Sequence, residues 1–292
     1  MTIPPRISIV VPFHDSEAFI QDCVTALLAQ RYPRDRFEIV MIDNNSTDRS
    51  AGIVSRCPGV RLLSEPTPGA YAARNLGVRE SSGDIVAFTD SDCTPDPAWL
   101  DAIAAALAPP EICVAQGRRR FAFESPGLAM MADYEAAKAA YTFSSGRKEI
   151  YYAYTNNMAV RRSAFDKAGP FEEWQRGADV VFVQRVIDAY SCGAIRYVPD
   201  MCVRHLEIRS VWTWLGKMHI YGRSFRHYRE HVQQRPLGGR DRVRVFRSTI
   251  RGGGYSPLKT LLLGGLLGVG LVAYEIARRG PAWKPGWPDA IR

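Results

Sequence analysis

Apolar runs rich in β-branched residues alternate with segments of helical periodicity over the first ninety residues. The runs are ISIVVP (7–12), FEIVMID (37–43), VRLL (60–63) and DIVAFTD (84–90), and helices are expected over 17–30, from a Ser46 N-cap towards Cys57, and over 70–81. Parallel strands that are buried on both faces read as continuous apolar runs, and they need helical crossovers between them. The alternation therefore predicts an α/β fold with a mostly parallel, Rossmann-like sheet that carries helices on both faces.

Polar residues follow three of the four predicted strands. Pro12 and His14 end the first strand, Asp43 ends the second, and Asp90-Ser91-Asp92 ends the fourth. In such sheets ligands bind beyond the carboxyl ends of the strands. Two neighbouring carboxylates repel each other unless a cation or ligand offsets their charge, although Asp also favours turns. Three polar strand ends at one rim favour a binding site over an Asp-rich turn.

Several known site types are missing from the sequence. Neither GxGxxG nor GxxxxGK[ST] is present, which excludes the common dinucleotide and P-loop signatures. The six cysteines contain no CxxC pair, so no zinc knuckle or redox motif is expected. MTIPPRISIVVP lacks the pattern of a secretory signal, which favours a reducing cytoplasm.

The ordered motifs resemble those of family 2 glycosyltransferases with the GT-A fold. They are VPFHDSE, IVMIDNNSTD, PGAYAARNLGVRESSGDIVAFTDSDCTPDPAWL, TNNMAVRRSAFDKAGPF, GADVVFVQR and VPDMCVRH, and the resemblance covers roughly residues 5–230. The usual Glu-Asp pair of the family is Ala178-Asp179 here, a departure that bears on recognition of the acceptor more than on catalysis. The QxxRW motif of processive members is also missing, which favours addition of a single sugar.

The resemblance implies roles for individual residues. Asp179 is the implied catalytic base, and Asp92 and His205 are the implied ligands of Mg²⁺ or Mn²⁺, with a diphosphate contact as the alternative for His205. The implied contacts with the nucleotide-diphosphate sugar are the base pocket (Pro12, His14, Asp43), the ribose (Asp90) and the remaining donor groups (Arg74, Ser91, Asn157).

The implied function is that of an inverting, metal-dependent enzyme that transfers one sugar from a nucleotide-diphosphate sugar, here a UDP-sugar, to an acceptor hydroxyl. A sugar nucleotidyltransferase is an alternative, although VPFHDSE lacks the glycine-rich loop that such enzymes carry after the first strand. A nucleotide-binding, membrane-associated protein with a decayed site is the second alternative. The retained acids at positions 43, 90, 92 and 179 argue against decay.

The C-terminal part is basic and then apolar. Residues 204–251 hold twelve Lys or Arg and three acids, whereas the whole chain has a net charge of +8. Residues 260–274 are uncharged, but as a helix they would reach only about 22 Å, short of the roughly 30 Å hydrocarbon core of a bilayer. They could therefore form a monotopic or re-entrant anchor, or a helix packed on the domain.

These features predict three units, a catalytic domain (1–210), a basic helical extension (211–256) and an apolar segment with a tail (257–292). The basic extension is expected to bind an anionic membrane surface and no nucleic acid, because no nucleic-acid motif accompanies it. We expect the protein on the cytoplasmic face of the cell membrane, with a lipid-linked or saccharide acceptor. The sequence predicts no oligomeric state.

Overall fold

The computed structural model describes residues 3–122, 125–174 and 176–280 of the chain. The strands are β1 (Ile7–Phe13), β2 (Phe37–Asp43), β3 (Arg61–Ser64), β4 (Ile85–Thr89), β5 (Cys93–Pro95), β6 (Val114–Phe121), β7 (Asn157–Arg161) and β8 (Ile195–His205). The α-helices are α1 (Ile20–Leu28), α2 (Ser50–Val54), α3 (Ala70–Glu80), α4 (Trp99–Ala106), α5 (Pro126–Ser144), α6 (Ala164–Ala168), α7 (Ala178–Ala189), α8 (Val211–Tyr228), α9 (Gly239–Gly253) and α10 (Pro257–Arg279).

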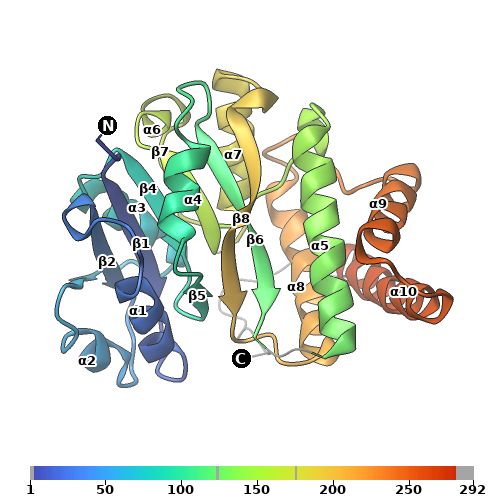
Figure 1. Cartoon of the computed structure of the whole chain (residues 1–292), viewed down its shortest axis with the longest axis horizontal. Helices are drawn as coiled ribbons and strands as arrows, with labels where there is room; N and C mark the ends of the chain where they lie inside the picture. The colour runs from blue at the N-terminus through green and yellow to red at the C-terminus, as the bar shows by residue number, and fades with distance from the viewer. Residues whose placement is uncertain (1–2, 123–124, 175, 281–292) are drawn as a thin grey trace.

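The strands form one sheet in the order β3-β2-β1-β4-β7-β6-β8-β5 (Figure 1). The first four strands pair in parallel, as the alternation of strands and helices predicts. Strand β7 then runs antiparallel between β4 and β6, and the short β5 pairs antiparallel with β8. The sheet therefore contains both parallel and antiparallel pairs, and the pairing of β5 with β8 brings residue 93 beside residue 205.

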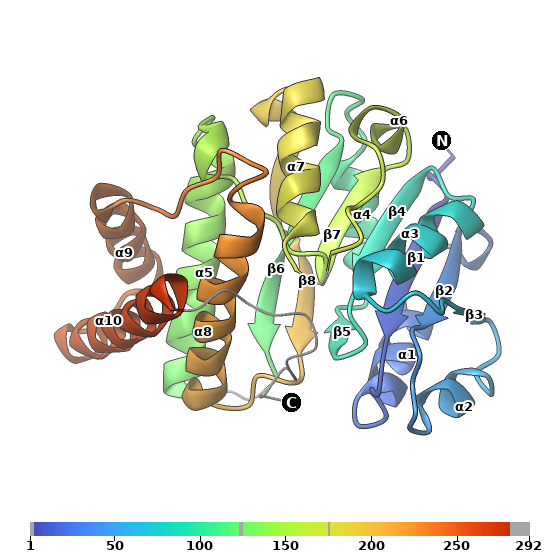
Figure 2. The same ribbon diagram turned by 180° about the vertical axis from the view of Figure 1, so that it is seen from behind.

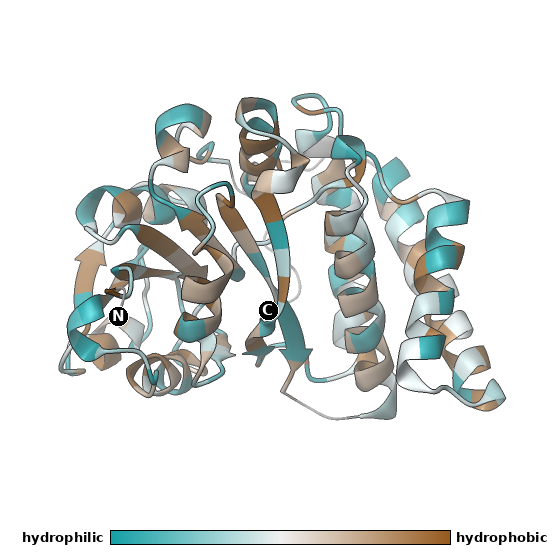
Figure 3. Cartoon of the chain, turned by 45° about the horizontal axis from the view of Figure 1, so that its top comes forward, coloured by the Kyte–Doolittle hydropathy of each residue, from teal (hydrophilic) through white to brown (hydrophobic). Residues whose placement is uncertain are grey.

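Helices cover both faces of this sheet, as expected. Ile9 and Val11 of β1 pack into a core shared with α1 and α4, whereas Val10 packs into a second core shared with α3, α6 and α7. This division follows from the geometry of a strand, whose successive side chains point to opposite faces. Figure 3 shows the consequence, because the central strands are mostly brown and the outer helices alternate between teal and brown.

The first ninety residues follow the predicted elements closely, with one correction at the second helix. That helix begins at Ser50, and its N-cap is Arg49 rather than Ser46. The Ser46 hydroxyl instead accepts a hydrogen bond from the backbone N–H of Asp15, at 3.2 Å. Ser46 thus ties two loops together, which is the alternative use of a short polar side chain near a turn.

The C-terminal helices pack on α5 at the edge of the molecule farthest from β3 (Figures 1 and 2). Helices α8 and α10 approach closely because glycine faces the partner helix in both. A Cβ built on Gly222 would lie 2.3 Å from the Tyr274 carbonyl oxygen, and one on Gly270 would lie 2.8 Å from the Trp214 ring. Helix α9 is fastened by Asp241, whose carboxylate accepts from the Tyr141 hydroxyl at 2.6 Å and pairs with Arg147 at 2.9 Å.

Candidate active site

The carboxyl ends of β1 and β2 lie level with each other, so their following loops meet. Phe13 is in register with Asp43, and the buried Pro12 is in register with Ile42. His14 comes next, and its Nδ1–H donates to the carbonyl oxygen of Asn44 at 2.9 Å. About half of the His14 side chain remains exposed (52%), so its ring is available at the rim of the sheet.

Asp15 holds these two loops in place. Its backbone adopts a left-handed conformation (φ 44°), which is uncommon for a residue other than glycine. Its Oδ1 accepts from the backbone N–H of Thr47 at 2.7 Å and of Asp48 at 3.3 Å. The Thr47 hydrogen bond lowers the pKa of Asp15 below its ordinary value, against the effect of burial. Asp15 had no predicted role, although an Asp shortly after the end of a strand is a common signal for a turn.

Asn44 and Asp43 shape the neighbouring part of the rim. The Asn44 amide donates to the carbonyl oxygens of Glu65 and Thr67, both at 2.8 Å, and its Oδ1 accepts from the Gly69 N–H at 2.7 Å. Asp43 is half-buried, and its Oδ1 accepts from the Ser46 N–H at 3.1 Å. Asn44 therefore joins the ends of β2 and β3 to the start of α3, and Asp43 lies beside this joint.

Arg74 links the end of β4 to the α3 helix. It is buried (4% exposed), and its guanidinium donates to Asp90 Oδ1 at 2.5 Å. The same guanidinium lies over the Tyr71 ring, 5.1 Å from its centroid. The buried charge of Arg74 is thus held against Asp90, whose side chain remains 34% exposed at the rim.

Asp92 and His205 lie together at the point where β5 meets β8. His205 Nε2 is 3.5 Å from Asp92 Oδ2, and the Cys93 thiol donates to Asp92 Oδ1 at 3.4 Å. Potential ligand atoms of Asp92, Cys93 and His205 lie within 4.8 Å of one another. Burial raises the pKa of Asp92 above its ordinary value, although the nearby imidazole opposes this shift.

Asp179 lies in the first turn of α7, next to the Tyr71 and Arg74 side chains. Burial raises the pKa of its carboxyl group, while a hydrogen bond from Tyr71 and the charge of Arg74 lower it in part. One Asp179 oxygen also accepts from the Val180 N–H at 2.9 Å. Arg74 therefore lies close to both Asp90 and Asp179. Tyr71 had no predicted role, but it lies three residues before Arg74 on α3, which is the spacing of one helix face.

Gly177 and Ala178 set the position of Asp179. Gly177 is the N-cap of α7 in a left-handed conformation (φ 89°), and its Cα packs so closely on the Tyr228 ring that a Cβ would lie 2.3 Å from it. Ala178 is fully buried in the core under α7. The position where the family usually has Glu is thus occupied by a core methyl group.

Ser91 and Asn157 are buried, and their side chains make contacts within the protein. The buried Ser91 hydroxyl lies 2.8 Å from the Ser16 hydroxyl. Asn157 is fully buried, accepts from the Trp99 indole N–H at 2.8 Å, and donates to the carbonyl oxygens of Arg118 and Met201. The expected donor contact of Asn157 is therefore corrected to an internal tie between three parts of the fold.

Replacing Asn157 by Ala is expected to lower the free energy of unfolding by about 2–4 kcal/mol, because buried partners lose their hydrogen bonds. Urea unfolding measures this loss. The KM for the donor should stay near the wild-type value at a temperature where the variant is folded. A large rise in KM without a loss of stability would contradict the internal role.

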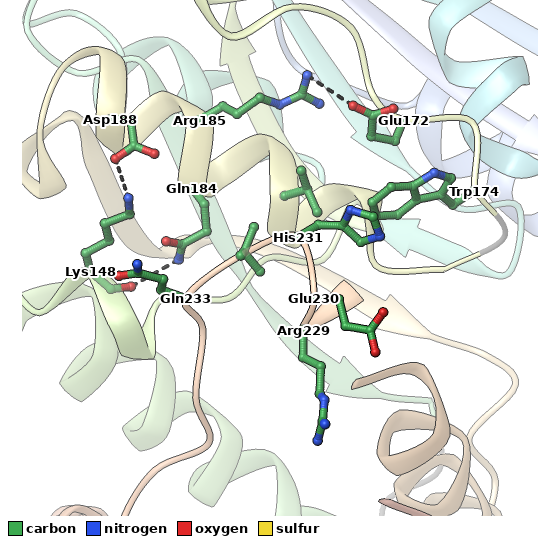
Figure 4. A pocket seen from close by; sticks show the side chains of 12 residues that line it. Lys148, Glu172, Trp174, Gln184, Arg185, Asp188, Arg229, Glu230, His231 and Gln233 are labelled. Carbon is green, nitrogen blue, oxygen red and sulfur yellow. Dashed lines mark hydrogen bonds and ion pairs between the residues drawn. The ribbon is translucent and has the colours of Figure 1, made fainter. Parts of the chain in front are cut away.

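A cavity of about 740 Å³ lies outside this site, between α7 and the segment after α8 (Figure 4). Gln184, Asp188 and His231 line it, together with Trp174, whose ring centroid lies 4.4 Å from that of His231. At 3.6 residues per turn, Asp188 and Asp179 lie on opposite faces of α7, and Asp179 is not among the residues that line this cavity. Trp174 thus packs on the His231 ring.

The model of the family described as Glycosyl transferase family 2 matches residues 8–169, more than half of the chain. The chain belongs to glycosyl transferase family 2. Among curated relatives of this family, Glycosyltransferase AglE of Haloferax volcanii is 29% identical over 191 residues, which cover 63% of this chain and 62% of AglE. The Pre-mycofactocin glycosyltransferase of Mycobacterium tuberculosis is 27% identical over 75% of this chain and 46% of its own length. The family 2 chain described here thus spans about half to three fifths of these relatives.

Solved structures confirm the GT-A fold that the sequence motifs predict. The mannosyltransferase PcManGT from Pyrobaculum calidifontis, in complex with GDP-Man and Mn²⁺, has a TM-score of 0.62 at 19% identity and covers 99% of this chain and 78% of its own. S. aureus TarS 1–349 in complex with UDP-GlcNAc has a TM-score of 0.55 at 18% identity, over 92% and 81% of the two chains. At these sequence identities, the similarity to the solved structures shows only that this family 2 member has the same fold.

Proposed function

We propose that this family 2 member is an inverting, metal-dependent glycosyltransferase that moves one sugar from a nucleotide-diphosphate sugar to an acceptor hydroxyl. The observation that carries the proposal is the position of Arg74. It lies beside Asp90, which would face the donor, and beside Asp179, which would face the acceptor. The same rim holds Asp92 and His205 in contact. Side chains that could bind a nucleotide, side chains that could bind a divalent ion, and a carboxylate that could act as general base therefore lie at one edge of the sheet.

The donor would lie over the ends of β1, β2 and β4. Pro12, His14 and Asp43 would border the nucleobase, with Asp43 accepting a hydrogen bond from its edge, and Asp90 would accept from the ribose. We propose a UDP-sugar as donor. Structures with UDP-GlcNAc and with UDP-glucose, and one with GDP-Man, are among the fold relatives, which supports the donor class.

Asp92 and His205 fit a divalent cation. His205 is buried, and its Nδ1 has no hydrogen-bond partner in the part of the chain that the structure describes. A carboxylate and an imidazole suit Mn²⁺ better than Mg²⁺, because Mg²⁺ strongly prefers oxygen ligands. The Cys93 sulfur is a poorer match for Mn²⁺ than these two groups, because soft sulfur ligands favour softer metals. When bound, the ion would neutralise charge on the departing diphosphate.

Asp179 would act as the general base for the acceptor hydroxyl. A sugar hydroxyl is too weak an acid to ionise before it attacks, so proton transfer and attack on the anomeric carbon must act together. The raised pKa of Asp179 makes it a stronger base than an ordinary carboxylate. Attack from the face opposite the diphosphate would invert the configuration. Tyr71 and Arg74 would keep the carboxylate oriented.

The acceptor we propose is a hydroxyl of a lipid-linked glycan or another saccharide at the cytoplasmic face of the cell membrane. The support comes from α10, which is long and apolar enough to meet a membrane and whose outward face is exposed. The glycosyltransferase activity does not depend on this location. The two proposals can therefore fail separately.

Thermal shift with a panel of sugar nucleotides tests the transferase proposal. We expect stabilisation by a UDP-sugar when Mn²⁺ or Mg²⁺ is present and little without the ion, because only a ligand that binds the folded state raises Tm. A ligand at 100 times its Kd stabilises by about 2.7 kcal/mol.

Three results would contradict the transferase proposal. Release of pyrophosphate from a nucleoside triphosphate and a sugar phosphate would support a sugar nucleotidyltransferase. Donor binding without any transfer or hydrolysis would support a decayed binding protein. Stabilisation by no sugar nucleotide at all would exclude the proposed donor site.

A further inference from the structure

Helix α10 carries two apolar stripes on opposite faces, and both run along its whole length. The inner stripe consists of Leu263, Gly270 and Ala277, each seven residues from the next and each buried. Leu263 packs there in a cluster with Leu128 of α5 and Trp214 of α8. The outer stripe consists of exposed residues, namely Leu258, Leu261, Leu262, Val269, Val272 and Ile276.

The outer stripe exposes more apolar surface than is usual for a helix face that contacts only water. Leu258, Leu261 and Ile276 are 67%, 73% and 62% exposed, and the exposed residues recur at helical spacing from the first turn to the last. Contiguous exposed apolar surface of this kind marks an interaction site rather than ordinary surface. Helix α10 therefore needs a partner along its full length.

The inner stripe decides how α10 can meet a membrane. The 23-residue helix is about 34 Å long, enough to span a hydrocarbon core of roughly 30 Å and longer than the segment 260–274 implies. However, its inner face stays packed on α5 and α8, and a spanning orientation would draw those helices and their charged residues into the lipid. An orientation in the plane of the membrane surface exposes only the outer stripe to lipid.

Helix α9 adds a ridge of positive charge. Arg240, Arg244, Arg247 and Arg251 recur at helical spacing and are all exposed, while Asp241, Val245 and Thr249 are buried on the other side. Within the described part of the chain, none of the four ridge arginines forms an ion pair. In both views α9 and α10 form the outer edge of the molecule, with α5 and α8 between them and the sheet (Figures 1 and 2).

We propose that the outer stripe of α10 and the arginine ridge of α9 form one face, the lipid face, that docks in plane on an anionic bilayer. Apolar side chains enter the boundary between headgroups and acyl chains, and the arginines pair with lipid phosphates. A second copy of the chain fits less well, because a symmetric contact through the ridge would bring like charges together. The lipid face thus selects monotopic docking over a spanning or re-entrant anchor.

Flotation of the full-length protein with preformed vesicles tests the lipid face, without donor or acceptor. We expect binding to vesicles that contain phosphatidylglycerol, and much weaker binding to phosphatidylcholine alone. Arg244→Gln with Arg247→Gln should weaken binding by about 25-fold, about fivefold for each charge removed. Leu262→Glu with Val269→Glu should weaken it by more than about 100-fold. Because no sugar chemistry is involved, failure here would leave the transferase proposal intact.

Matched variants keep the test specific. Arg56→Gln with Arg79→Gln removes two exposed charges elsewhere, and Leu28→Glu with Tyr190→Glu alters two exposed apolar side chains, at the end of α1 and at the C-cap of α7. Both controls should float like the wild type, and circular dichroism should show that all variants are folded. Wild-type protein that does not float, or glutamate variants that float normally, would overturn the proposal.

Two other results would assign the outer stripe to a different partner. Resistance of the bound protein to alkaline carbonate extraction would mean a spanning helix. A lipid-free dimer that Leu262→Glu with Val269→Glu converts to a monomer would mean that the stripe binds a second copy. Either outcome would overturn in-plane docking.

Discussion

Asp179→Asn is expected to lower kcat by about 10²–10⁴-fold, the usual contribution of a positioned general base, while donor affinity changes little. The substitution keeps the shape of the side chain and removes its ability to take a proton. Because burial raises the pKa of Asp179, ionising it opposes folding at neutral pH. The variant should therefore be at least as stable as the wild type near pH 7, and loss of activity cannot be ascribed to unfolding.

The pH dependence gives a second measure of the same group. A base must be ionised, so kcat/KM should fall as the pH drops through the raised pKa of Asp179, above the ordinary value of 3.8. The contribution of Asp179 to the free energy of unfolding changes with pH in the opposite direction to kcat/KM. It is present at low pH and is lost as the pH rises through that pKa. Asp188→Asn, an exposed position on the same helix, is the matched control. Wild-type turnover in Asp179→Asn would show that another residue is the base.

Asp92→Ala is expected to remove metal-dependent stabilisation by the donor and to lower kcat/KM by on the order of 10³-fold, since a Lewis acid contributes several kcal/mol. His205→Ala should produce the same kind of loss through the same ion. If both residues hold one ion, the double variant should lose little more than either single variant, because their effects are coupled. Isothermal titration with Mn²⁺ in the presence of UDP measures the affinity directly.

Asp101→Asn provides the control for this series, because Asp101 is an exposed carboxylate on α4 away from the cluster. It should bind Mn²⁺ and donor like the wild type. Losses that simply add in the Asp92 and His205 double variant would mean that the two residues act separately. In that case His205 would contact the diphosphate rather than the ion.

The sequence predicts the first half of the fold well because its signals are local. The apolar runs of β1, β2 and β4 belong to strands that are buried on both faces, so their composition alone marks them, whereas β3 is a partly exposed edge strand. The antiparallel insertion of β7 carries no such local signal. Nor does the pairing of β5 with β8, which unites Asp92 with His205 across more than a hundred residues. His205 was assigned through family motifs, and not through any pattern that places it beside Asp92.

Asn157 shows how a local signal can be present and still be overlooked. It shares a strand face with Ala159, which belongs to the core under α4, so strict alternation points its amide inwards. The resemblance to the family motif nevertheless suggested that Asn157 contacts the donor, against the alternation of side chains along the strand. Asp15 and Tyr71 show the converse, because their roles depend on loops and helices that meet only after folding.

Tyr228 restricts where this chain can be truncated or joined to another protein in a chimera. Its ring packs on Gly177, and burial together with the nearby Tyr274 and Asp179 raises its pKa well above the ordinary value. One side chain of α8 thus lies against both the helix that bears Asp179 and the apolar helix α10. A chimera that exchanged the C-terminal helices for those of another protein would need a matching aromatic ring at this position. The boundary between catalytic and C-terminal parts is consequently a poor point for truncation, and both parts are expected to evolve together.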